Sequence, residues 1–126
     1  MKEVKDINIK SKRQLPPWEE IVAKMHDEGL HFSDEYDIVD VVYSVNKEHR
    51  FVILKSVSGF LTYKYQYLML DHEDEWEYYP EDAIPAYWYS SDWSYSERET
   101  TSLFGDINDL MRDLKATPAY KRYFEN

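Results

Sequence analysis

The middle of the chain alternates between two kinds of side chain at the period of a β-strand. In an extended strand, neighbouring side chains point to opposite faces of the sheet. One face would carry Leu61, Tyr63, Tyr65, Tyr67 and Met69, and the other would carry Thr62, Lys64 and Gln66. This pattern predicts a central strand over residues 61–69, which constrains the rest of the fold because a strand needs partners.

Two further strands are expected just before this one. Residues 37–45 and 50–57 are rich in the β-branched side chains that favour strands. Residues 46–49 form a polar turn between them, and Ser58-Gly59 is a two-residue connection to the third strand. Connections this short predict antiparallel pairing. One side of the first strand would carry Val39, Val41, Tyr43 and Val45.

A helical pattern precedes the strands. Pro16 and Pro17 suit its first turn, where the missing N–H of proline goes unused. Gly29 suits a left-handed cap at its end. The apolar face of this helix would consist of Trp18, Ile21, Val22 and Met25.

Another helical pattern follows the strands. It is expected to begin near Thr101 and to end at Thr117-Pro118, which would also cap a short last helix over residues 118–124. The apolar stripe of the longer helix would consist of Leu103, Phe104, Ile107, Leu110, Met111 and Leu114.

The expected fold class follows from the order of these elements. Residues 75–79 and 84–89 are possible additional strands at edges or ends of the sheet, because prolines interrupt both segments. We predict an α+β fold with a single antiparallel sheet of three to five strands. An N-terminal helix and one long plus one short C-terminal helix would flank one face of that sheet. Residues 1–14 would form a basic arm, and residues 15–126 a single domain.

The composition excludes several classes of protein. The chain has no cysteine, so disulfides, thiolate metal sites and a cysteine nucleophile are ruled out. No apolar run approaches the roughly 20 residues of a membrane span, and the N-terminus lacks the apolar core of a signal peptide. We therefore expect a cytoplasmic protein with no membrane partner. A net charge of −10 repels phosphate backbones, so direct nucleic-acid binding is not expected.

The sequence also lacks motifs for catalysis and for cofactors. The four histidines do not have the spacing of a metal site, and the acidic run at 71–75 lacks the central glycine of a calcium loop. Three isolated glycines cannot form a phosphate-binding loop, and the serines at 90–96 are not in a GxSxG context. We predict that the protein is not an enzyme and holds no metal or cofactor.

One segment combines acidity with aromatic content. Residues 71–99 contain ten carboxylates but a single base, Arg98. Eight aromatic side chains are interleaved with the carboxylates. Residues 1–15 carry a net charge of +3 by contrast. Carboxylates steer a cationic partner toward a surface, and Trp and Tyr are enriched among the anchors of protein interfaces. The combination predicts a cognate basic protein as partner.

Two other interpretations of this segment stay open. The rings could pack inward while the acids face water, and an inward Trp88 would then turn Tyr87 and Tyr89 outward. Alternatively, exposed Trp and Tyr rings flanked by carboxylates could bind a glycan or another small ligand. Glycan sites rarely need so much negative charge, which favours a protein partner. The predicted partner-binding residues are Glu75, Trp76, Glu77, Tyr78, Tyr79, Glu81, Asp82, Trp88, Asp92 and Trp93.

The chain resembles bacterial toxin-immunity proteins, the cytosolic antidotes of polymorphic or contact-delivered toxins. The shared features are small size, acidity, absence of cysteine, the α+β order, and the closing stretch LMRDLKATPAYKRYF at 110–124. The resemblance implies a stoichiometric inhibitor of a cationic toxin, often a nuclease. Phage-encoded inhibitors of host defence nucleases have a similar composition, so that origin stays open as well.

Overall fold

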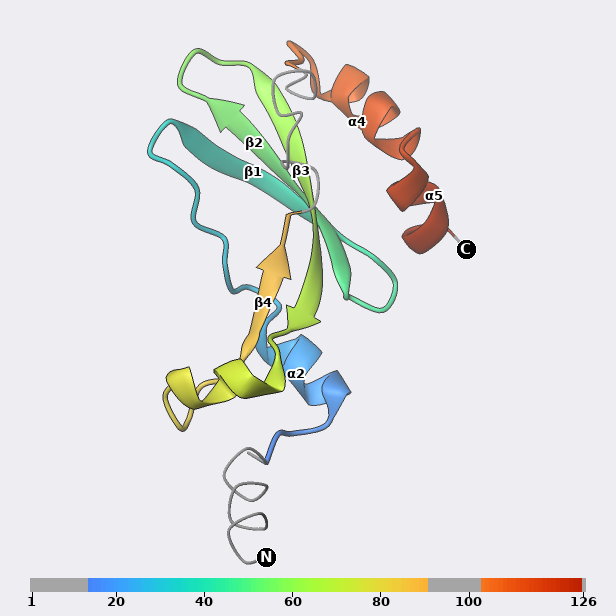
Figure 1. Cartoon of the computed structure of the whole chain (residues 1–126). Helices are drawn as coiled ribbons and strands as arrows, with labels where there is room; N and C mark the ends of the chain where they lie inside the picture. The colour runs from blue at the N-terminus through green and yellow to red at the C-terminus, as the bar shows by residue number, and fades with distance from the viewer. Residues whose placement is uncertain (1–13, 91–102, 126) are drawn as a thin grey trace, which may run out of the picture.

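The computed structural model of this protein describes residues 14–90 and 103–125. In chain order the elements are helix α2 (Trp18–Lys24), strands β1 (Tyr36–Tyr43), β2 (His49–Ser56) and β3 (Leu61–Leu70), the 3₁₀ helix η1 (Glu73–Tyr78), strand β4 (Ala86–Tyr89), and helices α4 (Ile107–Lys115) and α5 (Pro118–Tyr123) (Figure 1). This arrangement confirms the predicted α+β class. The predicted boundary between an arm and a domain lies beside residues 1–13, which are outside the described residues, and it stays a prediction.

The four strands form one antiparallel sheet in the order β1-β2-β3-β4, so each strand pairs with its neighbour in sequence. Strand β3 is paired on both edges, with Phe51 opposite Tyr65 on one side and Tyr89 opposite Tyr67 on the other. The prediction of a central strand is therefore confirmed. The predicted two-residue connection before β3 is wrong, because β2 ends at Ser56 and β3 begins at Leu61. Gly59 lies within this longer turn and has a φ of +97° that other residues rarely adopt.

Strand β1 departs from the predicted alternation. Its register with β2 shifts between Ile38 and Asp40, so Val39 lies in a bulge and is 49 % exposed. The Asp40 carboxylate accepts a hydrogen bond from the Val41 backbone N–H at 2.8 Å. The alternation fails at Val39 because the extra residue displaces it from the pairing pattern.

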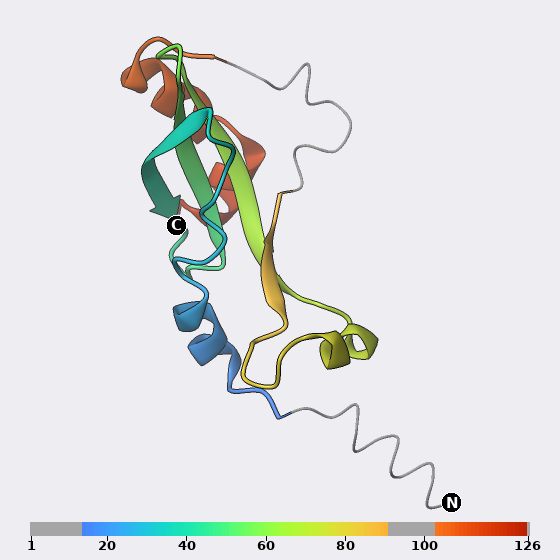
Figure 2. The same cartoon turned by 90° about the vertical axis from the view of Figure 1, so that its left-hand side faces the viewer.

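The helices cover opposite faces of the sheet, and the prediction that they share one face is wrong. Helices α4 and α5 pack on the face that carries Phe51 and Tyr65, where Leu110 and Leu114 are fully buried. Helix α2 packs on the other face. Leu68 of β3 points to that second face and would be exposed without α2, which explains the two-sided arrangement. Figure 2 shows α2 at the β4 end of the sheet, away from α4 and α5.

The predicted apolar face of α2 is confirmed in its main residues. Ile21 and Val22 are buried, and Trp18 and Met25 pack around them. The helix ends earlier than predicted, because Met25 is its C-cap and a turn follows. Gly29 is therefore not the helix cap. Its φ is +71°, and a Cβ there would lie 3.4 Å from the nearest guanidinium nitrogen of Arg50, so glycine permits a close approach.

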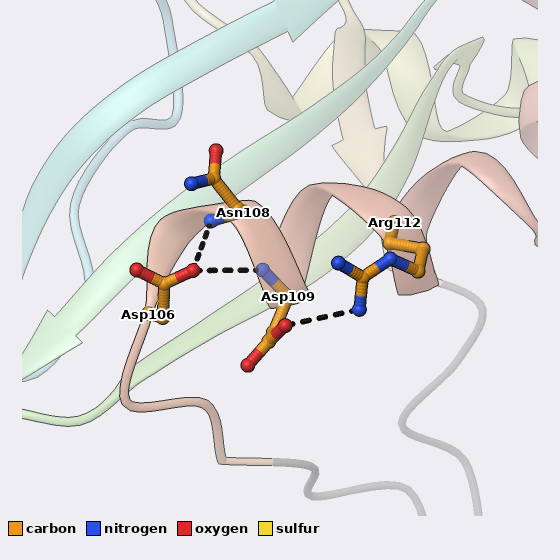
Figure 3. Close-up of polar contacts among 4 residues, drawn as sticks. All are labelled: Asp106, Asn108, Asp109 and Arg112. Carbon is orange, nitrogen blue, oxygen red and sulfur yellow. Dashed lines mark hydrogen bonds and ion pairs between the residues drawn. The ribbon is translucent and has the colours of Figure 1, made fainter.

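The first C-terminal helix begins at Ile107, not near Thr101. Asp106 is its N-cap, and one carboxylate oxygen accepts hydrogen bonds from the backbone N–H groups of Asn108 at 3.0 Å and Asp109 at 3.3 Å (Figure 3). Phe104 is not helical, because its N–H and C=O both bond to Leu61 at 2.8 Å and extend the sheet. This long-range pairing stops the helix from starting earlier.

Helix α5 begins as predicted and docks on the sheet through aromatic rings. The Thr117 side chain accepts a hydrogen bond from the Tyr120 N–H at 3.2 Å, and Pro118 occupies the first turn. The ring of Tyr123 stacks on His49 with centroids 3.6 Å apart, and His49 Nδ1 lies 2.7 Å from the Tyr65 hydroxyl. Burial lowers the pKa of His49 and raises the pKa of Tyr65 to about 12, so both groups pack here in their neutral forms near neutral pH. None of the described helices is long and apolar enough to span a bilayer.

Candidate partner-binding surface

The acidic turn, defined here as residues 71–82, connects β3 to the segment before β4. It contains seven carboxylates and no Lys or Arg. Residues 73–78 form η1, so the predicted strand at 75–79 is wrong. The Glu75 N–H bonds to the His72 C=O at 2.9 Å, and the Tyr79 N–H bonds to the Trp76 C=O at 3.1 Å. These local bonds satisfy the backbone within the turn, where a strand would need a further partner.

Asp71 is the first residue of the acidic turn and accepts hydrogen bonds from three later residues of the turn. Its backbone C=O accepts a hydrogen bond from Trp76 Nε1 at 2.8 Å, and its carboxylate accepts one from the Tyr79 hydroxyl at 2.9 Å. The other carboxylate oxygen accepts the His72 N–H at 2.9 Å. Burial, the hydrogen bond to Asp71 and the charge of Asp71 raise the pKa of Tyr79. Trp76 and Tyr79 therefore use their polar atoms to hold the turn in shape.

The predicted carboxylates of the turn face solvent. Glu75, Glu77, Glu81 and Asp82 are all exposed, and Tyr78 beside them is 75 % exposed. Within the described residues, the observed ion pairs join other residues, Glu20 to Lys24 and Asp109 to Arg112. The acidic turn thus presents negative charge that no described base neutralises through an ion pair.

Trp88 lies elsewhere, on the face of the sheet that α2 covers. Its Nε1 donates a hydrogen bond to the Met25 C=O at 2.8 Å, and the guanidinium of Arg50 lies 4.0 Å from the centroid of its ring. The ring also packs against the buried cluster that includes Ile21 and Leu68. The structure therefore separates Trp88 from the exposed carboxylates with which it was grouped. Asp92 and Trp93, the last two predicted residues, lie outside the described residues.

An inward Trp88 turns its two neighbours outward, as expected for a strand. Tyr87 is 36 % exposed and Tyr89 is 40 % exposed. The register places Tyr89 opposite Tyr67 and Tyr87 opposite Met69, so the four side chains share one face. We call Tyr67, Met69, Tyr87 and Tyr89 the tyrosine face.

The tyrosine face is a packed surface. The rings of Tyr67 and Tyr89 meet edge to face with centroids 5.4 Å apart, and those of Tyr87 and Tyr89 are 6.4 Å apart. The hydroxyl of Tyr87 lies 3.8 Å from the sulfur of Met69. Sequence reasoning placed Tyr67 and Met69 on one face of their strand, but it did not predict that β4 would pair beside them.

The acidic turn leaves the sheet at one end of the tyrosine face. Asp71 directly follows β3, and its N–H bonds to the Pro85 C=O at 2.8 Å, one residue before β4 begins. Burial raises the pKa of Tyr87, and the negative charge of Asp71 raises it further. Figure 2 shows η1 and α2 on opposite sides of the β4 end of the sheet. Exposed carboxylates and exposed tyrosines are therefore adjacent.

A cleft of about 670 Å³ lies beside Trp88. Gln66 is the buried polar side chain in its wall, and both ends of its amide have partners. Its oxygen accepts a hydrogen bond from Arg50 Nε at 2.7 Å, and its nitrogen donates one to the Ser90 hydroxyl at 3.0 Å. The described residues contain no group of three or more His, Asp or Glu side chains arranged to hold a metal ion.

Comparisons of this chain with protein-family models, curated proteins and solved structures give no match.

Proposed function

We propose that this protein is an acidic inhibitor of the immunity type, which binds a basic toxin or nuclease and occludes its active cleft. The observation that carries the proposal is the acidic turn, whose exposed carboxylates form no ion pair with a described base and stand at the end of the exposed tyrosine face. A nuclease cleft is cationic because it binds phosphate, so the two surfaces are complementary in charge.

The two parts of the surface have different roles in this proposal. The carboxylates of the acidic turn attract the basic partner and raise its rate of association. The tyrosines supply apolar area that loses water once the complex has formed, and such rings carry much of the affinity in protein interfaces. The protein would act stoichiometrically in the cytoplasm, without direct contact to nucleic acid or membrane.

A small-ligand function is the weaker alternative. A glycan would stack on exposed indole rings, but one face of Trp88 is occupied by the Arg50 guanidinium. Trp76 is only partly exposed, and its N–H is bonded to Asp71. The buried amide in the wall of the 670 Å³ cleft has internal partners as well. These contacts favour the exposed acids and tyrosines as the binding groups.

Co-expression with the product of the adjacent gene tests the proposal. If that product arrests growth, the wild-type chain should restore growth, and a variant with Glu75, Glu77, Glu81 and Asp82 changed to Lys should fail. A matched control changes four exposed acids elsewhere, Glu19, Asp34, Asp37 and Glu125, to Lys and therefore has the same net charge.

The control variant should restore growth, because its acidic turn is intact. Both variants should fold, since exposed charges contribute only about 0–1 kcal/mol each to stability. An adjacent product that is harmless or not basic would count against the proposal, as would full protection by the variant with the reversed turn.

A further inference from the structure

The tyrosine face is the half of its sheet face that α4 and α5 leave uncovered. Helix α5 ends near His49, where the Tyr123 ring stacks on the imidazole. The Tyr67 ring also lies beside His49, with 6.2 Å between the ring centroids. Beyond Tyr67, the rings of Tyr87 and Tyr89 are more than a third exposed. Figure 1 shows α4 and α5 along the upper part of β3, with β4 beside its lower part.

The charge at the rim of this face identifies the kind of group that would cover it. Asp71 borders the face, and its carboxylate accepts hydrogen bonds from the His72 N–H and the Tyr79 hydroxyl. A carboxylate has about four acceptor positions, so Asp71 can still accept from a further donor. The acidic turn continues from Asp71 with six more carboxylates and no Lys or Arg. This negative charge favours a cationic occupant of the face.

An arginine side chain satisfies both features of this surface. Its planar guanidinium stacks on the face of an aromatic ring and simultaneously forms a hydrogen-bonded pair with a carboxylate. Lysine presents a compact, strongly hydrated ammonium, which loses more hydration when it is placed against rings. We infer that the tyrosine face is the docking surface for arginine side chains of a basic partner segment, stacked on Tyr87 and Tyr89 and paired with Asp71.

This inference rests on the proposed function and names the residue type by which the partner is recognised. It separates two contributions to binding. The acidic turn attracts any cation, whereas the tyrosine face discriminates arginine from lysine.

Titration with hexa-arginine and hexa-lysine peptides of equal charge tests the inference by calorimetry at low ionic strength. Wild-type protein should bind hexa-arginine more tightly by about threefold or more, because guanidinium groups favour aromatic faces. The double variant Tyr87→Ala/Tyr89→Ala should bind both peptides equally, at the wild-type affinity for hexa-lysine. Phe60→Ala is the matched control, since Phe60 is an exposed aromatic side chain just before β3, outside both the acidic turn and the tyrosine face. It should keep the preference for hexa-arginine.

Ring-proton NMR of the wild-type protein gives a second readout that does not depend on a variant. Hexa-arginine should shift the Tyr87 and Tyr89 ring signals more than hexa-lysine does at the same saturation. Equal affinities of the two peptides for wild type, absence of binding, or a preference that survives in the double variant would each overturn the inference. Growth protection by the wild-type chain is a separate measurement, so the proposed function can stand when this inference fails.

Discussion

Replacement of Arg50 by Ala is expected to lower the free energy of unfolding by about 3–5 kcal/mol, because it leaves several buried acceptors without a donor. Arg50 is fully buried in β2. Its Nε donates to the Gln66 side chain at 2.7 Å, and its two terminal nitrogens donate to the C=O groups of His26 at 3.1 Å and Glu28 at 2.9 Å. The guanidinium also stacks on Trp88, so one side chain joins β2, β3, β4 and the turn after α2.

The charge of Arg50 persists in the core despite the cost of burial. Burial lowers its pKa, but the ordinary value is so high that the guanidinium stays protonated at neutral pH. The acceptors are the backbone carbonyl oxygens of His26 and Glu28 in the turn after α2, and hydrogen bonds from a charged donor to such oxygens are strong. Arg50→Lys should be less severe than Arg50→Ala but still destabilising, because an ammonium cannot reproduce the planar fork.

Urea unfolding of the two Arg50 variants measures this effect, with Arg112→Ala as the control. The Arg112 side chain is 76 % exposed, and within the described part of the chain its ion pair is with Asp109 on the same helix. Its loss should change stability by no more than about 0.5 kcal/mol. If Arg50→Ala were as mild as the control, the proposed structural role of Arg50 would be wrong.

Replacement of Trp88 by Ala should have the second largest effect, a loss of about 3–5 kcal/mol. The change removes the indole from the cluster around α2, deletes the hydrogen bond to Met25 and uncovers Arg50. Trp76→Ala should cost less, because Trp76 lies in the exposed acidic turn and its main polar contact is with Asp71.

Thermal and urea unfolding of the Trp88 and Trp76 variants decides whether each ring belongs to the core or to the surface. The effects of Trp88→Ala and Arg50→Ala should not add, since the two side chains are in contact. A Trp88→Ala protein with wild-type stability would show that the ring is not part of the core. Trp88 would then again be a candidate residue of the binding surface.

Local sequence signals predicted those parts of the fold that depend on neighbouring residues. The alternation over residues 61–69 gave β3, and Thr117-Pro118 gave the start of α5. The prediction failed where a distant segment decides the outcome. The start of α4 was missed because Phe104 pairs with Leu61, and the position of α2 was missed because Leu68 needs cover on the second face.

The candidate site was predictable to a similar extent. The exposure of carboxylates such as Glu75 and Glu77 follows from the cost of burying charge, so their composition alone indicated a solvent-facing turn. The tyrosine face could not be derived, because it exists only through the pairing of β4 with β3. The role of Arg50 was also hidden, since a cation in a strand is ordinarily expected at the surface.

The rate constant of association with the growth-arresting protein tests the central claim most directly. It should be measured by stopped-flow mixing for the wild type, the variant with Glu75, Glu77, Glu81 and Asp82 changed to Lys, and the matched control variant. Raising the ionic strength from about 0.1 M to about 1 M shortens the Debye length from about 10 Å to about 3 Å. Wild type and control should both slow by about tenfold or more over that range. The variant with the reversed turn should already be slow at low salt. Equal rate constants for all three proteins at low salt would contradict the claim that the acidic turn guides a basic partner.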